Sequence, residues 1–258
     1  LRGGIASLLK GRSVTHLQGL ATLDAPGRVV VQGKSDKREV VTAKHIVLAT
    51  GSSPIRIPGW PDDPDYVCTS DEAVHWTSLP SRLLIVGGGV IGCEFACMMQ
   101  SFGVQVTIVE MLPHLLATLD NELGTELHKI FKARGISCHL DTKVEDMQLT
   151  KSGVRVRLSS AESLEFDRVL VATGRKPNTH HVALDQAGIS ADGRGFVSVN
   201  EQLETNVPNH YCIGDANGMS MLAHAASSQG VAVAENALGK KAPWQAKIPA
   251  AVYTFPEV

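Results

Sequence analysis

The segment that most restricts the fold is LLIVGGGVIGCEFA, residues 83–96, in which three glycines separate an apolar strand from an apolar helix. Gly87, Gly89 and Gly92 fit the spacing G-x-G-x-x-G. In such a turn the first glycine permits the tight bend, the second lets the backbone approach a pyrophosphate, and the third lets the helix pack against the strand. The amino-terminal end of the helix adds free N–H groups and a partial positive charge. A ligand-free strand–helix turn is the alternative, and the surrounding sequence decides between the two.

That surrounding sequence predicts a βαβαβ unit. Apolar runs after Ser81 and in 104–110 and 136–140 predict strands, and 90–103 and 120–135 predict helices between them, the second capped by Asp120. Short alternating runs that follow, up to Gly174, predict a small β section. We therefore expect the α/β class, with a doubly wound, Rossmann-like sheet that binds a dinucleotide.

Glu110 indicates which dinucleotide. It ends the second predicted strand, 18 residues after Gly92, close to the usual spacing of about 20. A carboxylate at this position accepts hydrogen bonds from the ribose hydroxyls and repels a 2′-phosphate. The residues after it, MLPHLL, include no arginine that could hold such a phosphate. The sequence therefore favours NAD over NADP.

Composition limits the class of protein. The 258 residues are 43% hydrophobic and 19% charged, which is typical of a soluble globular protein of one or two domains. The formal net charge of −2 gives no reason to expect nucleic acid or a membrane surface as a partner, and no apolar run is long enough to span a membrane. No signal peptide is evident. Five scattered cysteines suit a reducing compartment, so we expect a cytoplasmic location, and no cluster has the spacing of metal ligands.

Three residues on the helix after the turn allow two interpretations each. Cys93 and Cys97 are four positions apart, as expected of two small residues that face the core, and a redox pair is the less favoured alternative. Glu94 is either an acid in the first turn of the helix, where it favours the helix dipole, or a group near the nicotinamide end of the ligand.

The chain before the turn is predicted to be β-rich, with a proline-rich linker in 52–66 and a short helix capped by Thr69 or Ser70. It also contains an echo: KHIVLATGSSP at 44–54 and DRVLVATGRKP at 167–177 share a strand followed by Ala-Thr-Gly. Two copies suggest two related nucleotide-binding units.

Several motifs, taken in order, resemble the pyridine nucleotide-disulfide oxidoreductases. They are VLATGSSP, LLIVGGGVIGCEFA, VTIVEMLPHLLATLDNEL, VLVATGRKPNT, YCIGDANGMSMLAHAASSQG and IPAAVYTFPEV. The resemblance implies an NAD domain inserted in a partial FAD domain. It implies the rear part of the FAD domain in 1–75, the NAD domain in 76–195, the return of the FAD domain in 196–240, and the start of a dimerisation domain in 241–258. The turn at Gly87 would then be the second of two.

The resemblance also implies site residues for two cofactors. Those for NAD are Gly87, Gly88, Gly89, Val90, Ile91, Gly92, Cys93, Glu94, Glu110, Val144 against the adenine and Gly174 near the nicotinamide. Those for FAD are Gly19, Thr50, Gly51, Ser52, Asp215 at the ribityl chain, and Met221, Leu222, Ala223 and His224 at a helix start under the flavin. From the residues alone, Asp215 could equally be a turn or capping acid, and His224 an ordinary helix-start residue.

The same resemblance implies groups that this sequence lacks. No C-x4-C pair, first glycine turn or carboxyl-terminal His and Glu pair is found in the 258 residues. The chain reads as an internal fragment, and we expect it to be inactive by itself. For the parent, the resemblance implies an NAD-linked flavoenzyme, a dihydrolipoamide-type dithiol substrate, a homodimer and a possible 2-oxo acid dehydrogenase complex as partner.

Overall fold

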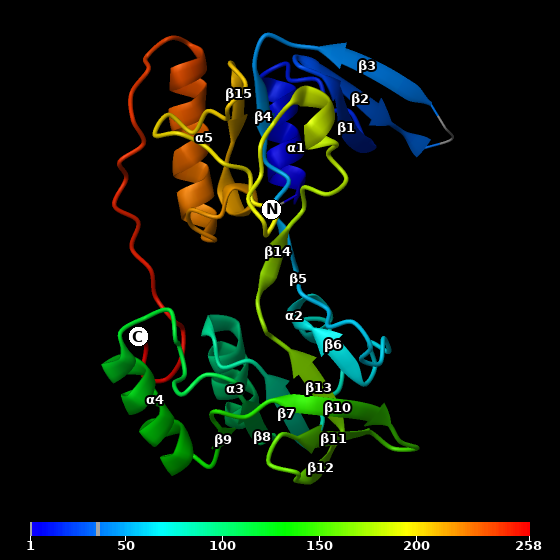
Figure 1. Cartoon of the computed structure of the whole chain (residues 1–258), viewed down its shortest axis with the longest axis vertical. Helices are drawn as coiled ribbons and strands as arrows, with labels where there is room; N and C mark the ends of the chain where they lie inside the picture. The colour runs from blue at the N-terminus through cyan, green and yellow to red at the C-terminus, as the bar shows by residue number, and fades with distance from the viewer. Residues whose placement is uncertain (1, 35–36) are drawn as a thin grey trace. The chain divides into compact units, whose positions relative to one another are not determined.

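The computed structural model describes residues 2–34 and 37–258, and the chain forms two compact units (Figure 1). Unit 1 contains 1–52 and 177–248, and unit 2 contains 53–176 and 249–258. Within the described ranges, no helix is long and apolar enough to cross a membrane.

Unit 2 is built on a parallel five-stranded sheet with the order β6-β13-β7-β8-β9. Its strands are β6 (Val67–Thr69), β7 (Arg82–Val86), β8 (Gln105–Val109), β9 (Ser137–His139) and β13 (Arg168–Val171). The helices are α2 (Ser70–Ala73), α3 (Val90–Ser101) and α4 (Asn121–Ala133). An antiparallel sheet contains β10 (Val144–Leu149), β11 (Val154–Leu158) and β12 (Ser163–Phe166). The predicted βαβαβ unit is confirmed, with Asp120 as the N-cap of α4.

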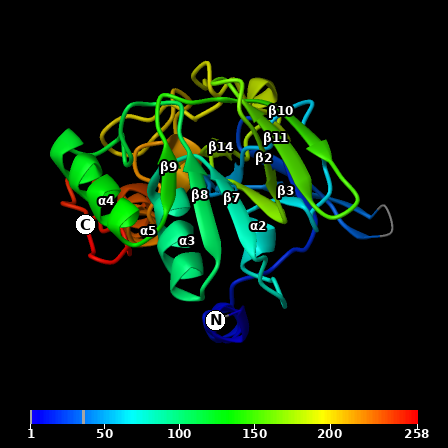
Figure 2. The same cartoon turned by 90° about the horizontal axis from the view of Figure 1, so that it is seen from below.

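Both faces of the parallel sheet are buried, which explains the continuous apolar run of β7. Leu83 and Ile85 pack into the core beneath α3 and α4, whereas Leu84 and Val86 pack against the antiparallel sheet. Figure 2 shows α3 and α4 on one side of β7, β8 and β9, and β10 and β11 on the other. A sheet covered in this way presents only the carboxyl ends of its strands as a ligand edge.

Unit 1 combines a meander with a parallel pair. The meander is β1 (Leu20–Ala25), β2 (Arg28–Gln32) and β3 (Arg38–Thr42), and the pair is β4 (Ile46–Leu48) with β15 (His210–Cys212). The helical segments are α1 (Arg2–Gly11), η2 (Leu184–Ala187), η3 (Gly214–Asn217) and α5 (Ala223–Ala237). The β-rich expectation holds for the meander, but it did not include α1, whose described side chains are mostly exposed.

Two short strands, β5 (Ser52–Pro54) and β14 (Arg175–Pro177), pair where the chain passes from one unit to the other. Each follows one copy of the Ala-Thr-Gly echo. The repeated segments therefore end in strands that are hydrogen-bonded neighbours.

The structural division differs from the boundaries expected at 75/76, 195/196 and 240/241. Residues 53–75 belong to unit 2 because β6 pairs with β13. Residues 177–195 belong to unit 1, where the N–H of Leu23 donates to the carbonyl of Val182. The last ten residues return to unit 2, since Val252 is buried in its core. Which cofactor each unit binds stays a prediction.

Candidate functional site

The glycine turn of unit 2 lies at the carboxyl end of β7. Gly87 has φ +111°, which favours glycine, and a Cβ there would lie 2.4 Å from the carbonyl oxygen of Ala172. A Cβ on Gly92 would lie 1.9 Å from the carbonyl oxygen of Gly87, so the third glycine allows α3 to approach the strand. A Cβ on Gly89 would meet no atom within 4 Å. Two glycines are thus required by the fold, and the third borders open space.

The amino-terminal end of α3 is suited to an anion. Gly89 is the N-cap and makes no side-chain capping bond, and no acidic residue lies in the first turn. The first N–H groups of the helix, on Val90 and Ile91, therefore have no side-chain acceptor at the cap. Such a helix end attracts phosphate through its dipole and its N–H groups.

Glu110 follows β8, beside the turn, and is 9% exposed. Its Oε2 accepts the N–H of Gly88 at 2.6 Å, and its Oε1 accepts the N–H of Leu112 at 2.8 Å. A carboxylate has about four lone-pair positions, so these two bonds leave acceptor capacity on both oxygens.

Other predicted NAD residues surround the same edge. Gly174, with φ +131°, follows β13, the sheet neighbour of β7. Val144 begins β10, two residues after Thr142, whose N–H donates to the carbonyl of Glu110. The carboxyl ends of β7, β8 and β13 therefore bring the predicted residues together, as parallel strands require.

The helix residues with two interpretations are now placed. Cys93 and Cys97 are buried in the core as free thiols, which confirms the structural interpretation. Burial is the main cause that raises the pKa of the Cys93 thiol, which donates to the carbonyl of Gly88 at 3.3 Å. Glu94 lies beyond the first turn of α3, so the first-turn interpretation was wrong; its Oε1 accepts the N–H of Tyr253 at 2.9 Å.

The predicted FAD residues of unit 1 gather at the carboxyl ends of β4 and β15. The Ser52 hydroxyl donates to Oδ2 of Asp215 at 2.6 Å. The carbonyls of Thr50 and Gly51 accept from the side chain and the N–H of Asn178, at 3.2 and 2.9 Å. Asn178 was missed by the sequence analysis, although it follows the second Ala-Thr-Gly copy by four residues.

Two other parts of the predicted FAD set lie away from these strand ends in the sequence. Met221, Leu222, Ala223 and His224 lie at the start of α5, with Leu222 as its N-cap, which confirms the predicted helix start. Gly19 precedes β1, where a Cβ would lie 2.4 Å from the carbonyl oxygen of Gln32. That contact gives Gly19 a packing role in the meander that needs no cofactor.

Residues missed by the sequence analysis hold Asp215 in place. The N–H of Gly214 donates to Oε1 of the fully buried Gln229 at 2.7 Å, and Asn217 Nδ2 donates to the same oxygen at 3.1 Å. Asn217 Nδ2 also donates to the carbonyl of Cys212 at 3.0 Å. Residues on both sides of Asp215 are therefore fixed to β15 and α5. Asn217 and Gln229 are separated by a short loop and the first turns of α5, so no local pattern in the sequence indicated this network.

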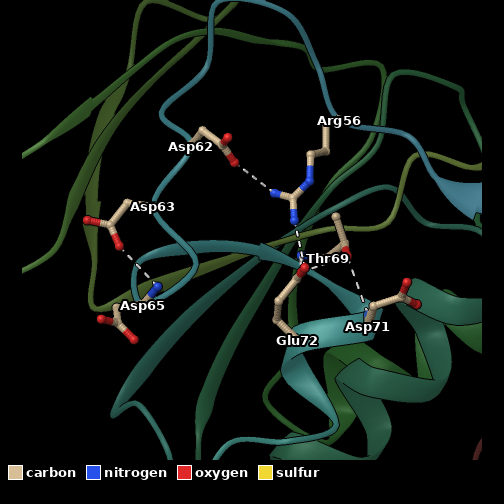
Figure 3. A network of polar contacts seen from close by, with 7 residues as sticks. All are labelled: Arg56, Asp62, Asp63, Asp65, Thr69, Asp71 and Glu72. Carbon is tan, nitrogen blue, oxygen red and sulfur yellow. Dashed lines mark hydrogen bonds and ion pairs between the residues drawn. The ribbon is translucent and has the colours of Figure 1, made fainter. Parts of the chain in front are cut away.

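A separate polar network in unit 2 explains the start of α2 (Figure 3). Arg56 donates to Asp62 at 3.1 Å and to Glu72 at 2.6 Å, and Thr69 and Glu72 form a reciprocal capping box. Burial opposes ionisation of Glu72, but the hydrogen bonds from Thr69 and the Arg56 charge outweigh it and lower the pKa of Glu72. The network borders a cavity of about 270 Å³ lined by Trp60, Val171 and their neighbours. The polar groups of this network pair with one another, and none of its residues was predicted to bind NAD or FAD.

Comparison with known proteins identifies the family. The sequence model of the pyridine nucleotide-disulphide oxidoreductases matches residues 4–230. The chain belongs to that family. A dihydrolipoyl dehydrogenase of Thermus scotoductus is 37% identical over the whole chain, which covers 56% of that relative, and one of Chlamydia pneumoniae is 38% identical, with 55% covered. The chain therefore spans a little over half the length of these curated relatives.

Solved structures agree with the fold. LpdA of Mycobacterium tuberculosis is 27% identical, with a TM-score of 0.91 over 99% of this chain and 57% of that chain. The HOCl-induced flavoprotein disulfide reductase RclA of Escherichia coli is 25% identical, with a TM-score of 0.88 over 99% of this chain and 59% of that chain. The predicted Rossmann-like α/β class and the predicted family are confirmed, and FAD and NAD are the cofactors of the dihydrolipoyl dehydrogenases that the chain resembles.

Proposed function

We propose that unit 2 binds NAD at the carboxyl edge of its parallel sheet. The observation that carries this proposal is the pairing of an uncapped α3 amino terminus with Glu110, whose carboxylate lies against the glycine turn. The pyrophosphate would bind at the helix end, beside the open space at Gly89. The remaining lone pairs of Glu110 would accept the adenosine ribose hydroxyls, and its charge would repel a 2′-phosphate.

This proposal gives a place to each of the residues predicted to bind NAD. Residues 87–92 would surround the pyrophosphate, Val144 would contact the adenine, and Gly174 would border the nicotinamide. Cys93 supports the turn from the core side, because its thiol is buried and bonded to Gly88. Glu94 would lie near the nicotinamide end.

We also propose that unit 1 carries part of an FAD site. The support is the convergence of Thr50, Gly51, Ser52 and Asp215 on one sheet edge. The start of α5, Met221 to His224, would lie under the flavin. Gly19 remains the weakest member of the set, since its contact with Gln32 already explains a glycine there.

For the whole protein we propose NAD-linked, FAD-dependent oxidation of dihydrolipoamide to lipoamide, by a homodimer that serves a 2-oxo acid dehydrogenase complex. The dihydrolipoyl dehydrogenase relatives support this choice. Bound FAD and NAD would supply the electron and hydride chemistry, and this chain would bind and orient them. Mercuric reductase and glutathione reductase are less favoured alternatives, because these usually prefer NADP and Glu110 opposes it. A transhydrogenase-like member of the family is a third alternative.

The chain by itself has a second candidate function, which is non-catalytic dinucleotide binding. The observation that favours it is that all five cysteines are free thiols and none forms a C-x4-C pair. We expect no turnover of dihydrolipoamide with NAD⁺ by the isolated chain.

The test is a titration of the chain with NADH and NADPH, followed by nicotinamide fluorescence. We expect saturable NADH binding and NADPH binding at least about tenfold weaker, because the added phosphate meets the Glu110 carboxylate. Equal affinities for NADH and NADPH would contradict the preference for NAD, and a chain that binds neither nucleotide would contradict the proposed site. Turnover of dihydrolipoamide by the chain alone would contradict the non-catalytic assignment.

A further inference from the structure

Gly88 occupies a position that the G-x-G-x-x-G spacing leaves free, yet both of its backbone groups are held. Its N–H donates to Oε2 of Glu110 at 2.6 Å. Its carbonyl accepts the N–H of Leu116 at 2.8 Å and the thiol of Cys93 at 3.3 Å. Two of these three partners come from the segment that follows β8, which therefore closes over the turn.

The packing around Gly88 is equally specific. A Cβ there would lie 2.6 Å from Cδ2 of Leu115 and 3.2 Å from Cβ and Cγ of Glu110. Leu115 is fully buried in the core, so it cannot move aside at low cost. At the neighbouring Gly89 a Cβ would meet nothing within 4 Å, and φ is −74°, which any residue adopts. Gly88 is thus packed by the chain itself, whereas Gly89 borders open space.

The segment that closes over Gly88 holds an unusual backbone. Leu116 has φ +51° although it is not glycine, and it is 1% exposed. A left-handed, buried leucine persists only where its surroundings stabilise it. Its N–H bonds to Gly88, and its carbonyl accepts the N–H of Leu119 at 2.8 Å. The strained residue is therefore the one that bonds to the turn.

We propose that Glu110 and Leu115 are positioning residues that hold the glycine turn in its ligand-binding conformation before the dinucleotide binds. Glu110 does so through the Gly88 N–H, and Leu115 through its contact with the Gly88 backbone. This inference rests on the proposed NAD site and adds a role in the ligand-free protein. A preformed turn needs no ordering on binding, so the ligand binds more tightly.

The test compares the Gly88→Ala and Gly89→Ala variants of the chain, in urea unfolding and in NADH titration. Gly88→Ala displaces Leu115 or Glu110, so the ligand-free variant unfolds at lower urea and binds NADH roughly tenfold more weakly. Gly89→Ala is the matched control, because its methyl group meets no atom of the chain and it therefore lowers the unfolding midpoint less than Gly88→Ala does. It weakens NADH binding, since its methyl group occupies the space beside the helix end.

Two further variants separate positioning from simple damage. Leu115→Ala in the Gly88→Ala background makes room for the added methyl, so the double variant binds NADH within about threefold of Leu115→Ala alone. Glu110→Gln raises hydrogen exchange at the Gly88 amide in the ligand-free chain, because an amide nitrogen replaces an acceptor. A role limited to the ribose would leave that exchange unchanged.

The outcomes distinguish this inference from the proposed function. A wild-type chain with no NADH affinity overturns the NAD site, and this inference with it. A wild-type chain that binds NADH, with Gly88→Ala as stable as Gly89→Ala, overturns only the positioning role. The positioning role is also overturned if the losses of NADH affinity caused by Gly88→Ala and by Leu115→Ala simply add in the double variant.

Discussion

The hydroxyl of Ser52 donates a 2.6 Å hydrogen bond to the carboxylate of Asp215, across 163 positions of the sequence. Ser52 follows β4 and Asp215 follows β15, and these strands are parallel neighbours. The bond therefore joins two predicted FAD residues that come from the two separate chain segments of unit 1. Removing either the Ser52 hydroxyl or the Asp215 carboxylate should therefore weaken flavin binding.

We expect Asp215→Ala to weaken FAD binding by more than about tenfold and Ser52→Ala by roughly three- to tenfold. The smaller effect of Ser52→Ala follows because one hydrogen bond is lost while the carboxylate remains. FAD titration of the chain, followed by flavin fluorescence, measures both. Thr125→Ala, at an exposed hydroxyl on α4 in unit 2, is the control. Equal affinity in Ser52→Ala and Thr125→Ala would contradict a role for the Ser52–Asp215 bond.

The buried amide network beside Asp215 should matter for stability. Gln229→Leu leaves the buried Gly214 N–H without this acceptor and removes one of the two hydrogen bonds of Asn217 Nδ2, which keeps its bond to the carbonyl of Cys212. The expected loss in free energy of unfolding is about 2 kcal/mol, the typical cost of one unsatisfied buried donor. Urea unfolding measures it against Gln186→Leu, at an exposed glutamine. If the two variants unfold at the same midpoint, the Gln229 bonds contribute nothing.

Arg134 should control the last residues of unit 2. Its Nη1 donates to the carbonyl of Phe255 at 3.0 Å, and its guanidinium carbon lies 5.1 Å from the centre of the Phe255 ring. Arg134→Ala removes both contacts, so chymotrypsin should cleave after the exposed Tyr253 several-fold faster. Arg155→Ala, at an exposed arginine paired with Glu165, is the control. Cleavage at the wild-type rate in Arg134→Ala would mean that other contacts hold the tail.

Alkaline pH should destabilise the fold through its thiols. Burial raises the pKa of Cys68 and of Cys212 to about 12 in the folded chain. A thiol in the unfolded chain ionises near pH 8.5, so above that pH the unfolded state binds fewer protons than the folded state. The contribution of each buried thiol to the free energy of unfolding is therefore fully present below about pH 8.5. It falls as the pH rises towards about 12, by up to roughly 1.4 kcal/mol per pH unit.

Urea unfolding between pH 7 and pH 10.5 measures this effect. Cys68→Ala and Cys212→Ala should each flatten the alkaline slope, although each also lowers stability at pH 7 by leaving a small cavity. A slope that is unchanged in both variants would show that the thiols do not cause the alkaline loss.

The sequence predicted those parts of the fold whose signals are local. The segment β7–α3–β8–α4 has two-sided burial, a glycine turn and a capped second helix, and each of these leaves a pattern within about twenty residues. The helix α1 was missed because Arg2–Gly11 contains three glycines and no acidic first turn, so no helix signal stands out. The boundaries of the units depend on pairings such as β6 with β13, between strands of only three and four residues that are distant in sequence.

Residues of the candidate site were likewise predictable only where their signal is local in the sequence. Glu110 was predicted because its distance from the glycines follows from the length of one helix and one strand. Leu115 and Leu116 were not, since a leucine that packs on the turn and a leucine with positive φ resemble any other apolar residue. Gln229 and Asn217 likewise acquire their role only through a contact between a helix and a distant strand end.

The alternation of the two units along the chain has a consequence for biosynthesis. Strand β4 is translated early, but its partner β15 appears only after the whole of 53–176 has been made. Val252, which completes the core of unit 2, follows the second half of unit 1. Domains tend to fold as units while the ribosome extends the chain. Unit 1 cannot be completed until 177–248 has been made, so apolar side chains of its first segment, such as Ile46 and Leu48, stay without their β15 partners while unit 2 is translated.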